Sequence, residues 1–238
     1  MLNQDSLKQF QDILKNYQPS KEAISIVRSL KLSIFLGPSA SGKNTIIKEL
    51  LKTGKYSYIV SDTSRPIRQN DGVFEIDGTD YWFRSEQQIL DDLKSGQYLE
   101  AEIVHSQQVS GISLRELSRV SHLNKPTLAD MDIGGVKKTL QINQSCKVFL
   151  ILPPSYETWI LRLNERSTIS DEEAKRRLKT SLKIFDSVEE VDPIIVINHN
   201  YIEAAKIIDN FLSDKNSKIN QNEGRNLLNE LRAKLANY

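Results

Sequence analysis

Apolar and polar positions follow two rhythms along this chain of 238 residues. Short apolar runs, typical of buried strands, cover residues 31–36, 57–60, 126–130, 147–152 and 193–197. Between and after them, apolar residues recur every three or four positions, which is the spacing of one helix face. This spacing predicts helices over 44–52, 113–122, 134–142, 156–164, 171–188 and 201–212. Short apolar strands that alternate with helices predict an α/β fold with a parallel sheet flanked by helices.

The same pattern divides the chain into three parts. They are a helical N-terminal extension (1–30), a central domain (31–213), and a polar linker with a C-terminal helix (214–238). Within the central domain, residues 61–111 break the strand–helix rhythm with polar, turn-rich and alternating sequence. Such a stretch predicts an insertion that covers one edge of the site.

Both ends of the chain carry amphipathic sequence. Helices are predicted at 5–17 and 21–30, and at 226–236 after a polar stretch from 213 to 224. The apolar stripes are Leu7, Phe10 and Leu14 at the first end and Leu228, Leu231 and Leu235 at the other. Isolated helices of this length are marginal in water, so each stripe is expected to be buried. The sequence leaves open whether the stripes pack on the central domain or at the seam of a homodimer.

Composition removes several classes of function. Lys+Arg 32 against Asp+Glu 31 gives a formal charge of +1, so no global field attracts nucleic acid or an acidic membrane. Cys146 is the single cysteine, which excludes an internal disulfide and fits a reducing compartment. No apolar run approaches the roughly 20 residues of a membrane span, and the N-terminus lacks the apolar core of a signal peptide. We therefore expect a cytoplasmic protein without nucleic-acid or membrane partners.

The first strand runs into a phosphate-binding pattern, GxxxxGK, and an amphipathic helix follows it. The residues expected to bind ATP are Gly37, Pro38, Ser39, Ala40, Ser41, Gly42, Lys43, Asn44 and Thr45. The two glycines permit the backbone angles that turn N–H groups inward, and the helix adds its positive N-terminal dipole. Lys43 is placed to reach the β- and γ-phosphates. Asn44 stands where a Ser or Thr hydroxyl normally meets Mg²⁺, while Thr45 keeps a hydroxyl available to a phosphate.

Further motifs follow the phosphate loop in a fixed order. They are 61–68 (SDTSRPIR) with 75–83 (EIDGTDYWF), 97–100 (QYLE), 129–132 (ADMD), and 152–155 (LPPS) with 162–168 (RLNERST) and 176–178 (RRL). With this ordered set the chain resembles the guanylate kinase family from about Leu32 to Leu212. The resemblance implies a P-loop NTPase-type parallel sheet with an inserted acceptor-binding region at 61–111 and a lid at 163–177. It also implies an ATP-dependent kinase that converts GMP or dGMP to the diphosphate, with Mg²⁺ accompanying ATP.

The resemblance assigns roles by position. The residues implied to be catalytic are Lys43, Arg65, Arg166 and Arg177. The residues implied to bind GMP are Ser61, Arg65, Arg68, Tyr81, Glu100, Asp130 and Asp132. Arginine suits phosphate because its donors are planar and bidentate, and a carboxylate matches the N1–H and N2–H₂ edge of guanine. No direct metal ligand is implied: Mg²⁺ is held through phosphates and water, with Asp130 as the candidate protein contact.

Other interpretations stay open on the residues alone. Arg65 and Arg68 are also typical of a solvated pair, Tyr81 of core packing, and Asp130 and Asp132 of helix caps before Gly134.

The chain also departs from the family pattern. Residues 70–74 lengthen the loop after Arg68, so the family's acidic residue is either Glu75 or Asp71. In 105–113 the family has a Tyr before the Gly and a hydroxyl after it, whereas this chain has Ser110 and Ile112, with Ser110 or Ser113 as substitutes. These departures keep two alternatives open. One is a kinase with a different acceptor, either another nucleoside monophosphate or ribose 1,5-bisphosphate, and the other is a non-catalytic binding module.

Overall fold

The computed structural model describes residues 2–70, 72–104, 107–165, 171–214 and 218–236. The chain forms two compact units. Unit 1 comprises Met1–Lys31 and Ser57–Thr127, and unit 2 comprises Leu32–Tyr56 and Leu128–Tyr238. The N-terminal segment thus shares a unit with the expected insertion. No helix among the described residues has the length and apolar character needed to cross a membrane.

Unit 2 is built on a parallel sheet. Its strands are β1 (Leu32–Leu36), β9 (Thr127–Asp130), β10 (Lys147–Leu152) and β11 (Ile194–Ile197), in the order β11-β10-β1-β9. Phe35 of β1 is paired with Phe149 of β10, which is paired with Ile194 of β11. The rings of Phe35 and Phe149 stack with centroids 5.5 Å apart, and every residue of β1 is buried. The predicted parallel sheet is confirmed.

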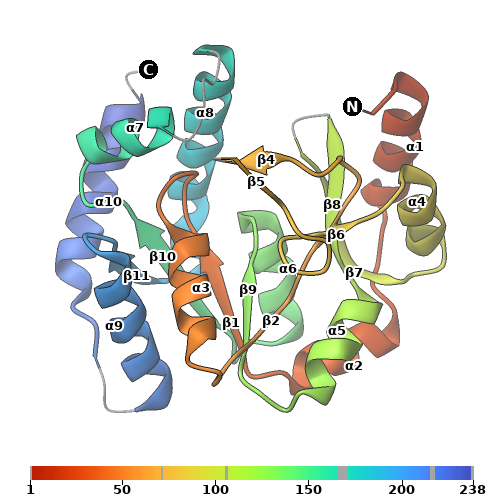
Figure 1. The fold of residues 1–238 in the computed structure, drawn as a ribbon, viewed down its shortest axis with the longest axis horizontal. Helices are drawn as coiled ribbons and strands as arrows, with labels where there is room; N and C mark the ends of the chain where they lie inside the picture. The colour runs from red at the N-terminus through yellow and green to blue at the C-terminus, as the bar shows by residue number, and fades with distance from the viewer. Residues whose placement is uncertain (1, 71, 105–106, 166–170, 215–217, 237–238) are drawn as a thin grey trace. The chain divides into compact units, whose positions relative to one another are not determined.

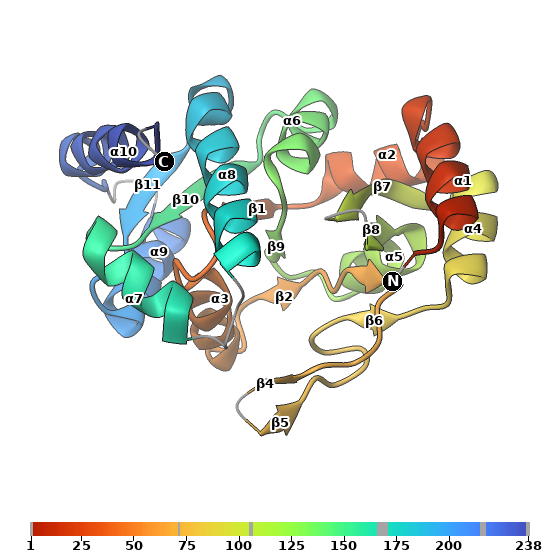
Figure 2. The same cartoon turned by 90° about the horizontal axis from the view of Figure 1, so that it is seen from above.

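Helices cover both faces of this sheet. They are α3 (Lys43–Lys52), α6 (Ile133–Ile142), α7 (Tyr156–Glu165), α8 (Asp171–Ser187), the 3₁₀ turn η1 (Val188–Val191), α9 (Tyr201–Ser213) and α10 (Gln221–Ala236). Figures 1 and 2 show α3 beside α9 on one face, with α6 and α8 on the other. Apart from α10, the helices end within one or two residues of the boundaries that the apolar spacing predicts, because that spacing records which face is buried.

The C-terminal helix begins earlier than the sequence indicated. Residues from Gln221 to Gly224 were expected to belong to a polar linker, but they form the first turn of α10. The reason lies at the sheet edge, because β11 ends the strand order and Gln221 bonds to it. The Ile195 N–H donates to Gln221 Oε1 at 2.8 Å, and Gln221 Nε2 donates to the Ile195 carbonyl at 3.5 Å. Leu228, Leu231 and Leu235, the predicted stripe, are buried, and α10 contacts α8 and β11.

Gly224 is the tightest point of this packing, which gives a stability prediction. A β-carbon there would meet Ile195 Cγ2 at 2.7 Å and Cβ at 2.8 Å. We therefore expect Gly224→Ala to lower the free energy of unfolding by about 1–3 kcal/mol through overpacking. Asn222→Ala, an exposed change in the same turn, is the matched control. Urea denaturation of both variants measures the difference, and equal midpoints would contradict the described packing.

Unit 1 holds a smaller, mostly antiparallel sheet. Its strands are β3 (Asp62–Thr63), β6 (Trp82–Phe83), β7 (Tyr98–Val104) and β8 (Gln108–Ser113), in the order β6-β3-β8-β7. The remaining elements are α1 (Gln4–Lys15), α2 (Lys21–Ser29), β2 (Ser57–Tyr58), the β4 (Gln69–Asn70) and β5 (Val73–Phe74) pair, α4 (Glu86–Lys94) and α5 (Leu114–His122). The strand predicted at 57–60 stops at Tyr58, because the Val60 N–H donates to Glu116 Oε1 at 2.7 Å instead.

The lengthened loop of the sequence is a β-hairpin. Strands β4 and β5 pair antiparallel, with Gln69 opposite Phe74. Figure 2 shows the hairpin extending away from β6 and the rest of unit 1. Val73 and Phe74 are exposed there, at 68% and 62%.

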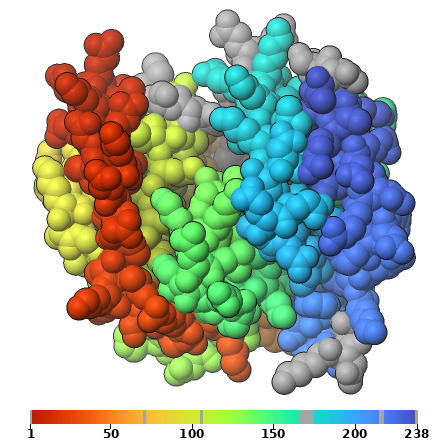
Figure 3. All heavy atoms as spheres, turned by 180° about the vertical axis from the view of Figure 1, so that it is seen from behind, coloured from red at the N-terminus to blue at the C-terminus, as the bar shows by residue number. Residues whose placement is uncertain are grey.

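The N-terminal helix packs within its own unit. Phe10 is fully buried in an apolar cluster with Ile89, Leu90, Leu93, Tyr98, Ala101 and Val109. Figure 3 shows the N-terminal segment, in red, lying against the yellow segment that contains α4. Phe10 of the first stripe is thus fully buried and Leu7 and Leu14 are half-buried, whereas all three leucines of the second stripe are buried within unit 2.

Candidate active site

The phosphate loop connects β1 to α3, as the sequence predicts. Gly37 has φ +150 and Gly42, the residue before α3, has φ +94. A β-carbon at Gly37 would collide with the Ile151 carbonyl oxygen, and one at Gly42 would collide with Asn198 Nδ2. Both positions therefore require glycine for space as well as for backbone conformation. The loop is held so closely that its peptide groups have little freedom.

Two buried side chains that the sequence analysis missed hold the outside of this loop. Trp159 Nε1 donates to the Ser39 carbonyl at 2.8 Å, and Asn198 Nδ2 donates to the Ser41 carbonyl at 2.8 Å. Asn198 directly follows the apolar run that forms β11, so a polar residue at a strand end was the available signal. The Ser41 hydroxyl is buried and has no hydrogen-bond partner among the described residues. A buried donor of this kind fits a ligand that brings phosphate oxygens.

Lys43 begins α3 and folds back over the loop. Its Nζ donates to the Gly37 carbonyl at 2.8 Å and reaches the Pro38 carbonyl at 3.5 Å. Asn44 and Thr45 are exposed in the first turn of the same helix. The N–H groups of that turn and the helix dipole form an anion-binding end beside the lysine. Lys43 and the loop therefore present one cationic, donor-rich surface.

Arg65 is the best-defined cation of unit 1. Its two terminal nitrogens bind both oxygens of Glu75, at 2.6 and 2.7 Å, and the Arg68 N–H donates to the same carboxylate at 2.9 Å. The guanidinium carbon lies 4.7 Å from the centre of the Tyr81 ring and 5.5 Å from that of Phe83. Arg65 is thus not a solvated arginine: it is buried and oriented. Together with the bond to the Pro66 carbonyl, these contacts hold the guanidinium in one orientation.

The structure answers which acidic residue organises this cation. Glu75 does so, while Asp71 lies outside the described residues. Burial raises the pKa of Glu75, but the hydrogen bonds from Arg65 and the Arg68 N–H outweigh burial and leave the pKa below its usual value. Burial likewise lowers the pKa of Arg65, and the Glu75 carboxylate more than compensates. The pair is therefore ionised near neutral pH.

The other expected acceptor contacts of unit 1 are dispersed along its strands. Ser61 precedes β3, where its carbonyl accepts from the Trp82 N–H at 2.9 Å, and Arg68 is exposed beside the β4–β5 hairpin. Glu100 is half-buried in β7.

Ser110 and Ser113, the proposed substitutes for the family's missing hydroxyls, are hydrogen-bonded to other groups of the protein. Ser110 Oγ donates to the Asp62 carbonyl at 2.9 Å, and the Ser113 hydroxyl caps α5. Ile112 is buried.

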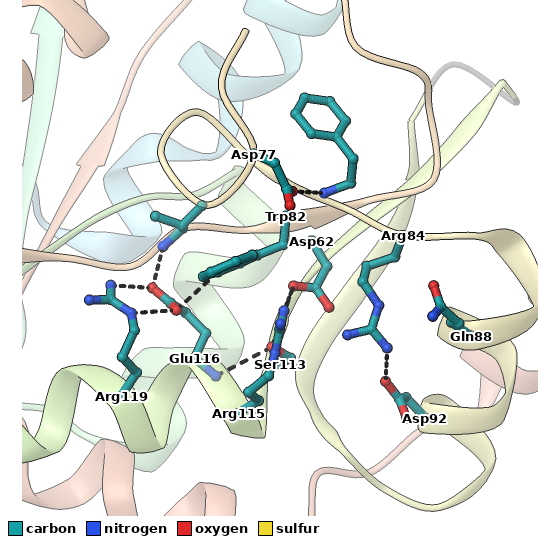
Figure 4. A network of polar contacts seen from close by, with 12 residues as sticks. Asp62, Asp77, Trp82, Arg84, Gln88, Asp92, Ser113, Arg115, Glu116 and Arg119 are labelled. Atoms are coloured by element: carbon teal, nitrogen blue, oxygen red, sulfur yellow. Dashed lines mark hydrogen bonds and ion pairs between the residues drawn. The ribbon is translucent and has the colours of Figure 1, made fainter.

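Buried carboxylates that the sequence analysis did not single out organise unit 1. Asp62 is fully buried and accepts from Tyr98 Oη at 2.7 Å and from Arg115 at 3.0 Å. Burial raises the pKa of Asp62, against the lowering effect of Tyr98 and Arg115. Glu116 accepts from Trp82 Nε1 at 3.1 Å and from Arg119, as Figure 4 shows. For Glu116, the sequence signal that could have indicated a buried carboxylate is its place on the apolar face of α5, between Leu114 and Leu117.

The remaining expected residues belong to unit 2. Asp130 ends β9 and is half-buried, and Asp132 caps α6 by accepting from the Gly135 N–H at 2.6 Å. Asp132 is therefore a helix cap, as one of the two interpretations of the sequence predicted. Arg177 is half-buried in α8. Arg166 lies outside the described residues.

Comparison with known proteins agrees with this fold. Residues 29–215 match the family model described as guanylate kinase. The guanylate kinase of Tropheryma whipplei is 32% identical over 69% of this chain and 84% of its own length. The guanylate kinase of Sulfurimonas denitrificans is 30% identical over 80% of this chain and 90% of its own. The crystal structure of guanylate kinase from Anaplasma phagocytophilum superposes with a TM-score of 0.60 and 25% identity, covering 80% of this chain and 89% of that one.

A strand, a glycine-bounded phosphate loop and a lysine-headed helix on a parallel sheet define a P-loop phosphotransferase. Within that class, the chain belongs to the guanylate kinase family. The resemblance on which the sequence analysis depended is confirmed. The helices α1 and α10 lie outside the matched residues.

The ion pair of Arg65 and Glu75 predicts a pH-dependent contribution to stability. Because the folded-state pKa of Glu75 lies below its ordinary value of 4.5, the pair stabilises the fold above that pH. This stabilisation is lost as the pH falls through the lower, folded-state pKa. We expect Glu75→Gln to cost about 1–3 kcal/mol at neutral pH, since it leaves a buried guanidinium poorly paired.

Urea unfolding across a pH series measures this effect, with exposed Glu22→Gln as the control. The difference between wild type and Glu75→Gln should shrink on acidification. A difference that stays constant through that range would contradict the ionised pair.

Proposed function

We propose that this protein transfers the γ-phosphoryl group of ATP to GMP or dGMP, giving ADP and the nucleoside diphosphate. The observation that carries the proposal is the phosphate loop between β1 and α3, with Gly37 and Gly42 in the loop and Lys43 at the start of α3. A binding module that no longer used nucleotide would have no need of two glycines that tolerate no β-carbon. The buried, oriented Arg65 of unit 1 supports a second, acceptor phosphate.

The roles of the residues follow from charge. An oxygen of the acceptor phosphate forms a bond to the γ-phosphorus, and the bond from that phosphorus to the β–γ bridging oxygen breaks. Lys43 stabilises the negative charge that grows on the β- and γ-phosphates, while Arg65, Arg68 and Tyr81 hold the acceptor phosphate. Arg166 and Arg177 are the proposed cations for the transferring group. No general base is needed, because the acceptor phosphate is already an anion.

Base recognition is assigned to Ser61, Glu100 and Asp132, with Glu100 accepting from the N1–H and N2–H₂ edge of guanine. Mg²⁺ neutralises phosphate charge when it is bound with ATP. The ion would be held through phosphate oxygens and water, with Asp130 as the protein group that would meet it and the Thr45 hydroxyl available to a phosphate. The single cysteine and balanced charge support a cytoplasmic location.

A substrate panel tests the acceptor. Wild-type protein is incubated with Mg·ATP and each of GMP, dGMP, AMP, CMP, UMP and ribose 1,5-bisphosphate, and the products are identified by mass. We expect GDP and dGDP to form fastest. Turnover of another acceptor with GMP inert would overturn the base assignment, and failure to bind Mg·ATP in calorimetry would favour the non-catalytic module.

Lys43 gives a sharper test of the chemistry. We expect Lys43→Ala to lower kcat by about 10²-fold or more, because a fixed cation at the transferring phosphoryl is removed. Lys48→Ala, an exposed lysine later in the same helix, is the control and should retain activity. Thermal melting of both variants confirms that they are folded. A Lys43→Ala variant with wild-type kcat would remove Lys43 from the mechanism.

A further inference from the structure

The outer edge of β7 is covered by one side chain from the N-terminal segment. Strand β7 ends the order β6-β3-β8-β7, so no strand among the described residues pairs with its outer N–H and C=O groups. At Tyr98 these two groups bind the hydroxyl of Tyr17. The Tyr98 N–H donates to Tyr17 Oη at 2.9 Å, and Tyr17 Oη donates to the Tyr98 carbonyl at 2.7 Å. The Tyr17 hydroxyl thus satisfies both backbone groups of Tyr98, as a neighbouring strand would.

This contact falls at an irregularity of the strand. Tyr98 pairs with Ser113 and Glu100 pairs with Ile112, so the register shifts between Tyr98 and Glu100. An extra residue in one strand bends it and changes the direction of the side chains that follow. Leu99 is buried while Glu100 is half-buried. The direction of Glu100 therefore depends on how the Tyr98 peptide is held.

Tyr17 is itself firmly placed. Phe10, fully buried on α1, packs in the cluster that also contains Tyr98. The other end of the segment is tied as well, since the Leu2 N–H donates to the Gln107 carbonyl beside β8 at 3.0 Å. Figure 1 shows α1 standing next to α4 and the β7–β8 pair. Burial raises the pKa of Tyr17, against the effect of its bond to the Tyr98 carbonyl, so the hydroxyl keeps the proton that it donates.

The far side of Tyr98 is fixed independently. Its own hydroxyl donates to Asp62 at 2.7 Å, and Asp62 begins the strand that leads to Arg65. The Tyr98 side chain is thus anchored under β3, while its peptide groups depend on Tyr17. Loss of the Tyr17 hydroxyl would free the peptide without removing the Tyr98 anchor.

We propose that Tyr17 is a positioning residue for acceptor recognition, acting through the Tyr98 peptide on Glu100. The N-terminal segment, which lies outside the family match, is then part of the acceptor-binding machinery. This inference rests on the proposed function, because it takes Glu100 as the group that binds the guanine edge.

Tyr17→Phe tests the inference by removing one oxygen atom. We expect the KM for GMP to rise about fivefold to tenfold, with kcat and the KM for ATP within about twofold of wild type. The preference for GMP over IMP, which lacks the 2-amino group, should also fall. A purely structural loss would not change that preference. Tyr56→Phe is the matched control, because Tyr56 Oη donates to Asp209 at 2.7 Å in unit 2.

Amide hydrogen exchange of the protein without ligands gives an independent readout. The exchange rate of the Tyr98 amide should rise in Tyr17→Phe and should equal the wild-type rate in Tyr56→Phe. If wild type phosphorylates GMP but Tyr17→Phe keeps its KM and its GMP/IMP ratio, the inference fails and the proposed function stands. Unchanged exchange at Tyr98 also overturns the inference. A wild type that phosphorylates no monophosphate defeats the proposed function, and the inference with it.

Discussion

The organisation of unit 1 depends on one constraint: a carboxylate removed from water must be met by donors. Asp62, Glu75 and Glu116 are all buried or nearly so, and Asp62 and Glu116 accept from donors that lie far away in the sequence, whereas the donors to Glu75 lie within ten residues of it. Asp62 joins β3 to Tyr98 of β7 and to Arg115 of α5. Glu116 joins α5 to Val60 and to Trp82 of β6. The strands β3 and β6 have only two residues each, so ladder hydrogen bonds alone hold them weakly. The hydrogen bonds of Asp62 and Glu116 tie these strands to β7 and α5.

The same constraint fixes the orientation of a cation. Glu75 holds Arg65 in one orientation before any ligand arrives, with aromatic rings against the guanidinium. A cation that is already oriented loses less side-chain entropy when it binds an anion. In unit 2 the corresponding order comes from the backbone, because Gly37 and Gly42 fix the loop and Trp159 and Asn198 hold its carbonyls. One unit thus orders its cation by a paired charge, and the other by close packing of the main chain.

The periodic elements of unit 2 were predicted from the sequence, whereas the helix α4 of unit 1 and the contacts that depend on distant partners were missed. The strands and helices of unit 2 follow from apolar spacing, and the phosphate loop from two glycines and a lysine at a fixed separation. The early start of α10 could not be predicted, because it depends on the hydrogen bond between Gln221 and Ile195, which lie 26 residues apart in the sequence. The early end of β2 has the same kind of cause, in Glu116. For the candidate site, residue identities came from motif order, but the choice of Glu75 over Asp71 needed the contact with Arg65.

The two terminal segments meet one physical problem in the same way. Each unit has a sheet whose last strand exposes N–H and C=O groups, and exposed edges invite pairing with another chain. Tyr17 covers the edge of β7 with a hydroxyl that both accepts and donates, and Gln221 covers the edge of β11 with an amide that does the same. Both residues lie outside the family match. The amphipathic helices α1 and α10 also pack apolar residues within the same units, so each terminal segment contributes both apolar packing and an edge contact to its unit.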